Sequence, residues 1–101
     1  MPIPKRHVIN AEAAESLAIQ ALAFLAEEPE RLGRFLAITG VGPQDVRAAA
    51  REPGFLTGVL EYLTGDEGLL VEFATVLGVD PADIARASAA LGNKRFERDV
   101  P

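Results

Sequence analysis

The sequence predicts an all-α protein that folds as a compact six-helix bundle, and three observations lead to this expectation. Apolar residues recur at spacings of three and four, which is the period of an amphipathic helix. Glycine and proline residues divide the chain into segments of helical length. The composition, with 49% hydrophobic and 25% charged residues, is that of a globular domain. Because 101 residues suffice for one domain, an enzyme with separate cofactor and substrate domains is excluded.

The first half of the chain is expected to hold three helices. The first follows an N-cap at Asn10 and reaches Glu27. It has apolar residues on more than one side, which places it at the centre of the bundle. Pro29 suits the first position of a second helix, and Gly40 supplies the left-handed residue that ends it. A short third helix is predicted over residues 43–51.

The same signals predict three further helices in the second half. Each begins at a proline or an acidic cap and ends at a glycine, which gives helices over 53–64, 66–77 and 81–92. Asp80 caps the last helix, and Asp83 is placed to complete a capping box. The folded domain is therefore expected over residues 10–92, between a flexible leader over 1–9 and a mobile tail over 93–101.

The two halves of the folded region align with each other at an offset of 38 residues. The shared pattern is G-V-x-P-x-D followed by a branched aliphatic residue, at 40–46 and at 78–84. Such a period is typical of repeat proteins. The sequence therefore predicts two three-helix repeats, 10–51 and 53–92, related by a pseudo-two-fold axis near which the first and fourth helices meet. The alternative is that the caps, which supply half of the identities, produce the match alone.

Charge and cysteine content exclude several classes of function. Residues 1–51 hold six basic and six acidic side chains, so the net charge of −5 lies entirely in residues 52–101. Binding of nucleic acid over the whole surface is therefore not expected. The absence of cysteine excludes disulfides, thiolate metal ligands and thiol nucleophiles, and it fits a cytoplasmic protein. The longest uncharged run, 16–26, is too short to span a membrane.

No combination of side chains points to catalysis, so we expect a non-enzymatic protein without a cofactor or a metal site. His7, the only histidine, lies in the leader, where no fixed partner could orient it. Ser16 and Ser88 lack the motif that surrounds a nucleophilic serine. The remaining candidates are two groups of acids without calcium or di-iron spacing: Glu27, Glu28 and Glu30, and Asp66 with Glu67. Acids of this kind suit helix starts.

The turn TGVGPQD, residues 39–45, resembles the hairpin of helix-hairpin-helix DNA-binding proteins, in which backbone amides hold a phosphate. The resemblance implies a phosphate site made by Gly40, Gly42, Arg34, Arg47 and Arg51. Two residues count against it. Pro43 lacks an amide hydrogen, and Asp45 brings a carboxylate to the place where the phosphate would approach. The sequence therefore favours a structural turn and leaves nucleic-acid binding as the alternative function.

The remaining class of function is interaction with an unknown protein partner or with a second copy of the chain. The helices carry more apolar residues than a small bundle requires, and Phe55, Tyr62 and Phe73 are the expected contact residues. The tail places Phe96 among three basic residues, Lys94, Arg95 and Arg98. It is expected to be solvated, with docking on the acidic second half as the alternative.

Two stretches of the sequence carry a resemblance to a known family. They are AESLAIQALAFLAEEPERLGRFLAITGVGPQDVRA over 14–48 and EPGFLTGVLEYLTGDEGLL over 52–70. They resemble a family of small alphaproteobacterial proteins that is named as a domain of unknown function, number three-five-seven-two. The similarity spans about residues 14–92. This resemblance implies a bacterial, cytoplasmic protein and assigns no activity or catalytic residue.

Overall fold

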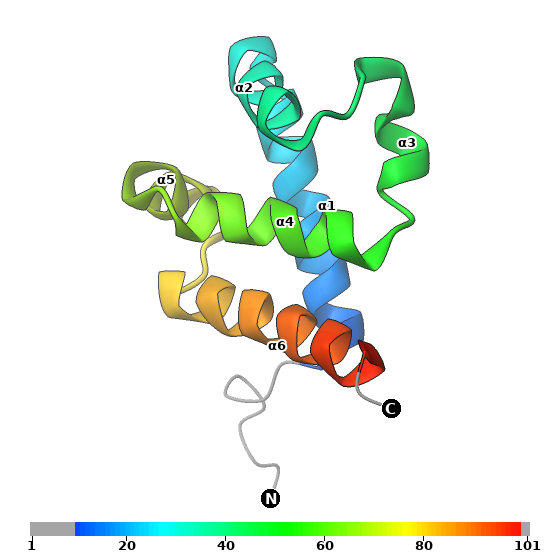
Figure 1. Cartoon of the computed structure of the whole chain (residues 1–101). Coiled ribbons are helices and arrows are strands. Elements are labelled where there is room, and N and C mark those ends of the chain that lie inside the picture. Colours follow the sequence, from blue (N-terminus) through cyan, green and yellow to red (C-terminus); the bar gives the residue numbers. More distant parts are fainter. Residues whose placement is uncertain (1–9, 100–101) are drawn as a thin grey trace, which may run out of the picture.

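Helices account for the regular structure between residues 10 and 99, the part of the chain that the computed structural model describes (Figure 1). No strand occurs within this range, so the all-α prediction with six α-helices is confirmed. In chain order the elements are α1 (Ala11–Ala26), α2 (Pro29–Thr39), the 3-10 turn η1 (Pro43–Asp45), α3 (Val46–Ala49), α4 (Pro53–Thr64), α5 (Glu67–Leu77) and α6 (Pro81–Asp99).

Side-chain caps and left-handed glycines set five of the helix ends, as the sequence predicted. The Asn10 carboxamide oxygen accepts a hydrogen bond of 2.7 Å from the Ala13 amide at the start of α1. Asp66 and Asp80 accept similar bonds at the starts of α5 and α6. Gly40 and Gly78 end α2 and α5 with φ angles of 76° and 73°, a conformation that residues with a Cβ rarely adopt.

Two predictions about α6 are wrong. The helix continues through Gly92 to Asp99, because Gly92 takes a helical conformation instead of the left-handed one of a C-cap. Residues 93–99 therefore continue the backbone of α6. The expected capping box is also absent, since the Asp83 carboxylate pairs with Arg86 one turn later. A charged donor forms a stronger hydrogen bond with a carboxylate than a backbone amide does.

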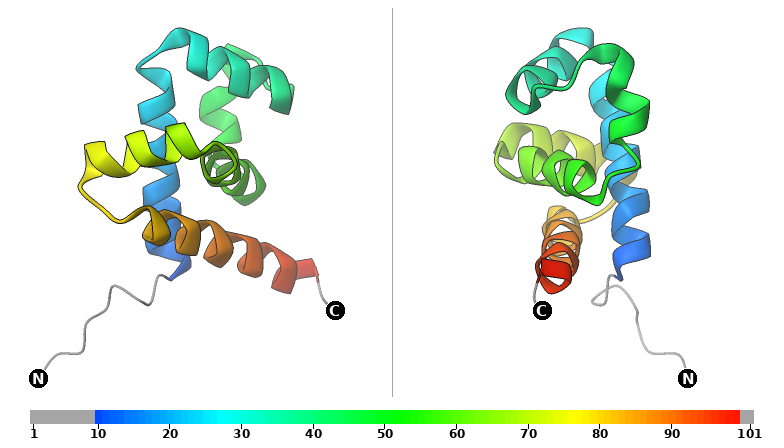
Figure 2. Two further views of the ribbon diagram at one scale, coloured as in Figure 1. Left: turned by 90° about the vertical axis from the view of Figure 1, so that its left-hand side faces the viewer. Right: turned by 45° about the vertical axis from the view of Figure 1, so that its right-hand side comes forward.

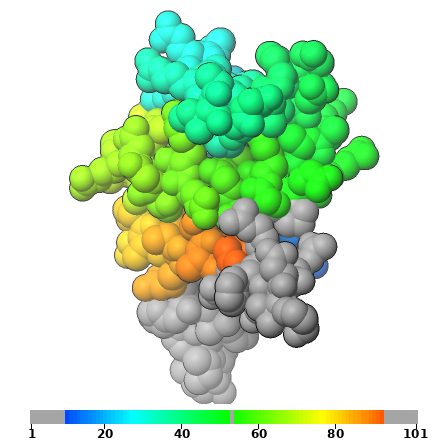
Figure 3. Space-filling view, viewed as in Figure 1, coloured from blue at the N-terminus to red at the C-terminus, as the bar shows by residue number. Residues whose placement is uncertain are grey.

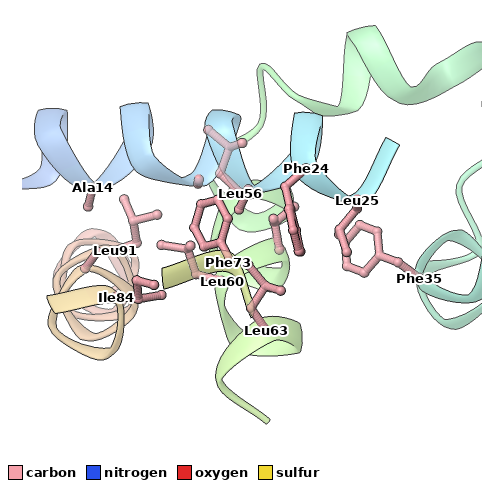
Figure 4. Close-up of a cluster of buried hydrophobic side chains, with 14 of the residues drawn as sticks. Ala14, Phe24, Leu25, Phe35, Leu56, Leu60, Leu63, Phe73, Ile84 and Leu91 are labelled. Carbon is pink, nitrogen blue, oxygen red and sulfur yellow. The ribbon is translucent and has the colours of Figure 1, made fainter. Parts of the chain in front are cut away.

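The core lies where α1, α4 and α6 pack against one another (Figure 2). α4 and α6 run in opposite directions and both cross α1. Ala14, Ala18 and Ala21 are fully buried on one side of α1, and such small residues let helices approach closely. Along α1, Ala14 lies beside Leu91 of α6, and Leu25 lies beside Phe35 of α2 (Figure 4).

Helix α1 is less enclosed than its apolar sequence predicted. It packs against α2, α4 and α6, and its contact with α4 confirms that the first and fourth helices meet. However, Ile19 is 52% exposed, and Ser16, Gln20 and Ala23 face solvent with it. Helix α1 therefore forms one side of the core and is not surrounded on all sides. The radius of gyration, 13.7 Å, is close to the value of about 13 Å expected for a compact domain of this length.

The structure does not contain the expected pair of three-helix repeats. The third helix of the second unit, α6, packs along both α4 and α1, whereas its counterpart α3 has four residues and packs mainly against η1. The lengths of α3 and α6 differ because of the residues that follow their first turns. Glu52 precedes Pro53 and is held in an extended conformation, which stops α3, while no proline interrupts α6. The shared pattern is thus confined to the turns.

Candidate functional site

The three aromatic residues expected to contact a partner lie in two different environments. Phe73 is only 1% exposed, so its selection as a contact residue was wrong. Its ring packs against Phe24 of α1, with centroids 5.2 Å apart. Phe55 and Tyr62 are half-buried and lie against Phe35 of α2 at centroid distances of 5.5 and 5.2 Å. These aromatic rings therefore fasten α1 to α5 and α2 to α4.

The turn between α2 and η1 is occupied by the protein's own groups. The Gly40 amide donates to the Leu36 carbonyl, the Val41 amide to the Thr39 hydroxyl, and the Asp45 amide to the Gly42 carbonyl. A Cβ placed on Gly42 would lie 3.3 Å from Asp45 Oδ2 and 3.4 Å from Gln44 Oε1. Side-chain oxygens, one of them from a carboxylate, thus cover the glycine that a phosphate would have to approach. This geometry favours a structural turn.

The basic residues proposed for the phosphate site are spread over three segments. Arg34 lies on α2, Arg47 on α3, and Arg51 between α3 and α4, and all three are exposed. Among the described residues, these three arginines form no ion pair, either with one another's neighbours or with a side chain of the turn. The helix that follows the turn, α3, has four residues and no side-chain cap. The arrangement provides no preformed cradle for an anion.

One basic residue that the sequence analysis did not select makes the most extensive polar contacts. Arg31 Nη2 donates to both carboxylate oxygens of Glu72, at 2.8 and 2.9 Å, and thereby joins α2 to α5. The Arg31 guanidinium carbon also lies 5.0 Å from the centre of the Phe24 ring. The hydrogen bond to Glu72 raises the pKa of Arg31 above its ordinary value. The contact between Arg31 and Glu72 joins residues 41 positions apart, so helical spacing gave no signal for it.

Over the last two turns of α5, the solvent-facing side is formed by Val71, Glu72, Thr75 and Val76, and we call it the α5 face. The first turn adds Gly68 and the exposed carboxylate of Glu67 at the N-terminal edge of this face. Val71 is 48% and Val76 is 66% exposed, and Val79 continues this surface after the helix. The Thr75 hydroxyl donates to the Val71 carbonyl at 2.8 Å, so the polar group is satisfied within the helix. The one charged side chain of the face, Glu72, is paired with Arg31. The α5 face is therefore aliphatic around one ion pair, whose Arg31 also lies 3.8 Å from Glu28.

Other residues considered in the sequence lie at exposed positions or beyond the described side chains. Glu27, Glu28, Glu30, Asp66 and Glu67 are exposed. Among the side chains that the structure describes, no three carboxylates or histidines converge as a metal site requires. His7 and the side chains of the basic tail, with Phe96, lie outside the described parts.

Residues 11–94 match the family described as "Protein of unknown function (DUF3572)". The chain belongs to the DUF3572 family. The match covers α1 to α5 and most of α6. It confirms the resemblance found in the sequence. No curated protein and no solved structure matches this DUF3572 chain. In the part of the chain described here, no helix has the length and hydropathy needed to cross a membrane.

Proposed function

We propose that this DUF3572 protein is a non-enzymatic interaction module that associates with a second copy of itself through the α5 face. The proposal rests on one observation, the aliphatic character of this solvent-facing helix surface. An exposed apolar surface loses unfavourable contact with water when a partner covers it. The bacterial cytoplasm, as the setting for this association, remains a prediction from the family resemblance and from the absence of cysteine.

Charge supports a second copy as the partner. The chain carries a net charge of −5, so two copies repel each other unless the surfaces that meet are locally neutral. The α5 face comes close to this condition, because Glu72 pairs with Arg31 and a contact centred on Val71 and Val76 leaves the exposed Glu67 in water at its edge. Two such faces can meet in an antiparallel, self-complementary contact without burying an unpaired charge, which would be costly.

The mass of the protein in solution tests this proposal. We expect sedimentation equilibrium to give a mass that rises with concentration from 10.7 kDa toward about twice that value. Val76→Glu should shift the association to at least tenfold higher concentration, because the dimer would bury two unpaired carboxylates. This corresponds to about 1.4 kcal/mol or more.

Ile38→Glu provides the matched control. Ile38 is 71% exposed on α2, so the substitution adds the same charge at an equally exposed aliphatic position outside the α5 face. Its effect on association should be small. A wild-type protein that stays monomeric at millimolar concentration, or equal effects of the two substitutions, would contradict the proposal.

A further inference from the structure

The segment over residues 29–51, which contains α2, η1 and α3, is joined to the rest of the domain differently from the other helices. α1, α4 and α6 pack against one another along their lengths, and α5 packs on α4 and α6. By contrast, α2 packs closely along α1 alone, and α3 packs mainly against η1. In the space-filling view this segment forms the end of the molecule opposite α6 (Figure 3).

The segment contributes little to the buried core. Phe35 and Leu36 are its buried side chains, and neither η1 nor α3 adds one. Its other tertiary contacts are those of Phe35 with Phe55 and Tyr62 and those of Arg31 with Glu72 and the Phe24 ring. Three half-buried side chains also pack against the core: Leu32, Val41 and Val46. Opening this segment would therefore expose far less apolar surface than unfolding the whole domain would.

Both ends of the segment are natural hinge points. Glu28 precedes Pro29 with φ and ψ of −124° and 110°, and Glu52 precedes Pro53 with −91° and 125°. These extended residues interrupt the helical hydrogen bonding between α1 and α2 and between α3 and α4. A rotation at Glu28 and Glu52 can thus move the segment without unwinding either neighbouring helix.

We propose that residues 29–51 form a strap that opens as a unit about Glu28 and Glu52 while α1, α4, α5 and α6 stay folded. The Arg31–Glu72 ion pair holds this strap in its closed position. Both side chains of the pair are partly exposed, at 19% and 48%, so dissolved salt screens their attraction and favours the open form. Opening withdraws Phe35 from between Phe55 and Tyr62 and exposes the apolar surface beneath α2.

Native-state hydrogen exchange of the full chain tests the strap. In wild-type protein, the Leu32 and Gly40 amides of α2 should exchange through an opening that depends weakly on denaturant, whereas the amides of α1 and α4 require global unfolding. Arg31→Gln should speed exchange in α2 by about three- to tenfold and leave α1 and α4 unchanged. Arg86→Gln, which removes the ion pair inside α6, should not affect α2.

Thiol labelling gives a second measurement, because the natural chain has no cysteine. Leu36→Cys places a thiol on the buried side of the strap, and Leu60→Cys places one in α4. The first should be labelled faster, and the rate should rise with salt and with Arg31→Gln. Exchange of α2 with the same denaturant dependence as α1, or equal labelling rates at the two positions, would overturn the proposal.

Discussion

Phe24 of α1 packs against Phe73 of α5, with ring centroids 5.2 Å apart and ring planes inclined at 48°. Arg31 of α2 lies over the same Phe24 ring and holds Glu72, the residue before Phe73. Three helices that are separate in the sequence therefore meet at Phe24. Because α2 and α5 do not pack closely along their backbones, these side chains supply the link between them.

Phe73→Ala should lower the free energy of unfolding by about 3–5 kcal/mol, because it leaves a cavity in the core and removes the contact with Phe24. Urea unfolding followed by circular dichroism measures the change. Phe55→Ala, at a half-buried ring, serves as the comparison and should cost clearly less. Equal losses for the two variants would contradict the different burial of these rings.

Gly40→Ala and Gly78→Ala should each lower the free energy of unfolding by about 1–2 kcal/mol, because a Cβ is strained at positive φ. Gly33→Ala is the matched control. Gly33 lies inside α2 with no atom within 4 Å of the added methyl group, so this variant should be about 0.5–1 kcal/mol more stable than the wild type. Thermal and urea unfolding of the three variants give the comparison.

Gly92→Ala distinguishes a helix interior from a helix end. Gly92 is helical in α6, and an added Cβ would meet no atom within 4 Å. Alanine should therefore raise the free energy of unfolding by about 0.5–1 kcal/mol and increase the helical circular dichroism signal. A loss of stability would instead indicate that Gly92 ends the helix in a left-handed conformation.

Asp66→Ala should lower the free energy of unfolding by about 1 kcal/mol, because the carboxylate accepts a hydrogen bond from the Leu69 amide at the start of α5. Asp45→Ala is the control, since Asp45 precedes α3 without capping it. Its effect on urea unfolding should lie within about 0.5 kcal/mol of zero. If both substitutions cost the same, general loss of negative charge, and not capping, would be responsible.

Local chemistry determined the parts of the fold that could be predicted from the sequence. The starts of α1, α2, α4 and α5 follow from prolines and polar caps, which act on the nearest turn. At Gly92 this local reasoning predicted a helix end that the structure does not have. A glycine stops a helix only if the chain gains from a left-handed residue there, and the helical φ of Gly92 depends on the continuation of the helix beyond it.

Contacts between distant residues could not be derived in the same way. The apolar period of α5 identifies a face but not its neighbours, so it gave no reason to place Phe73 inside and Val76 outside. Likewise, helical spacing favours pairing Arg31 with a glutamate one turn away. Arg31 does lie 3.8 Å from Glu28 in this way, but its hydrogen-bonded partner Glu72 becomes available only when α2 lies across α5. The expected repeat failed for a related reason, because the turn residues matched while Pro53 limited α3.

The alanines at positions 14, 18 and 21 determine how closely the helix axes can approach. With one methyl group at each of these positions, neighbouring backbones can come within about 8 Å of each other, the lower limit for helix pairs. The interior of this small domain is therefore shaped by main-chain atoms as much as by bulky side chains. Valine at any of these three sites would push the helices apart. We therefore expect few residues other than alanine, glycine and serine at these positions.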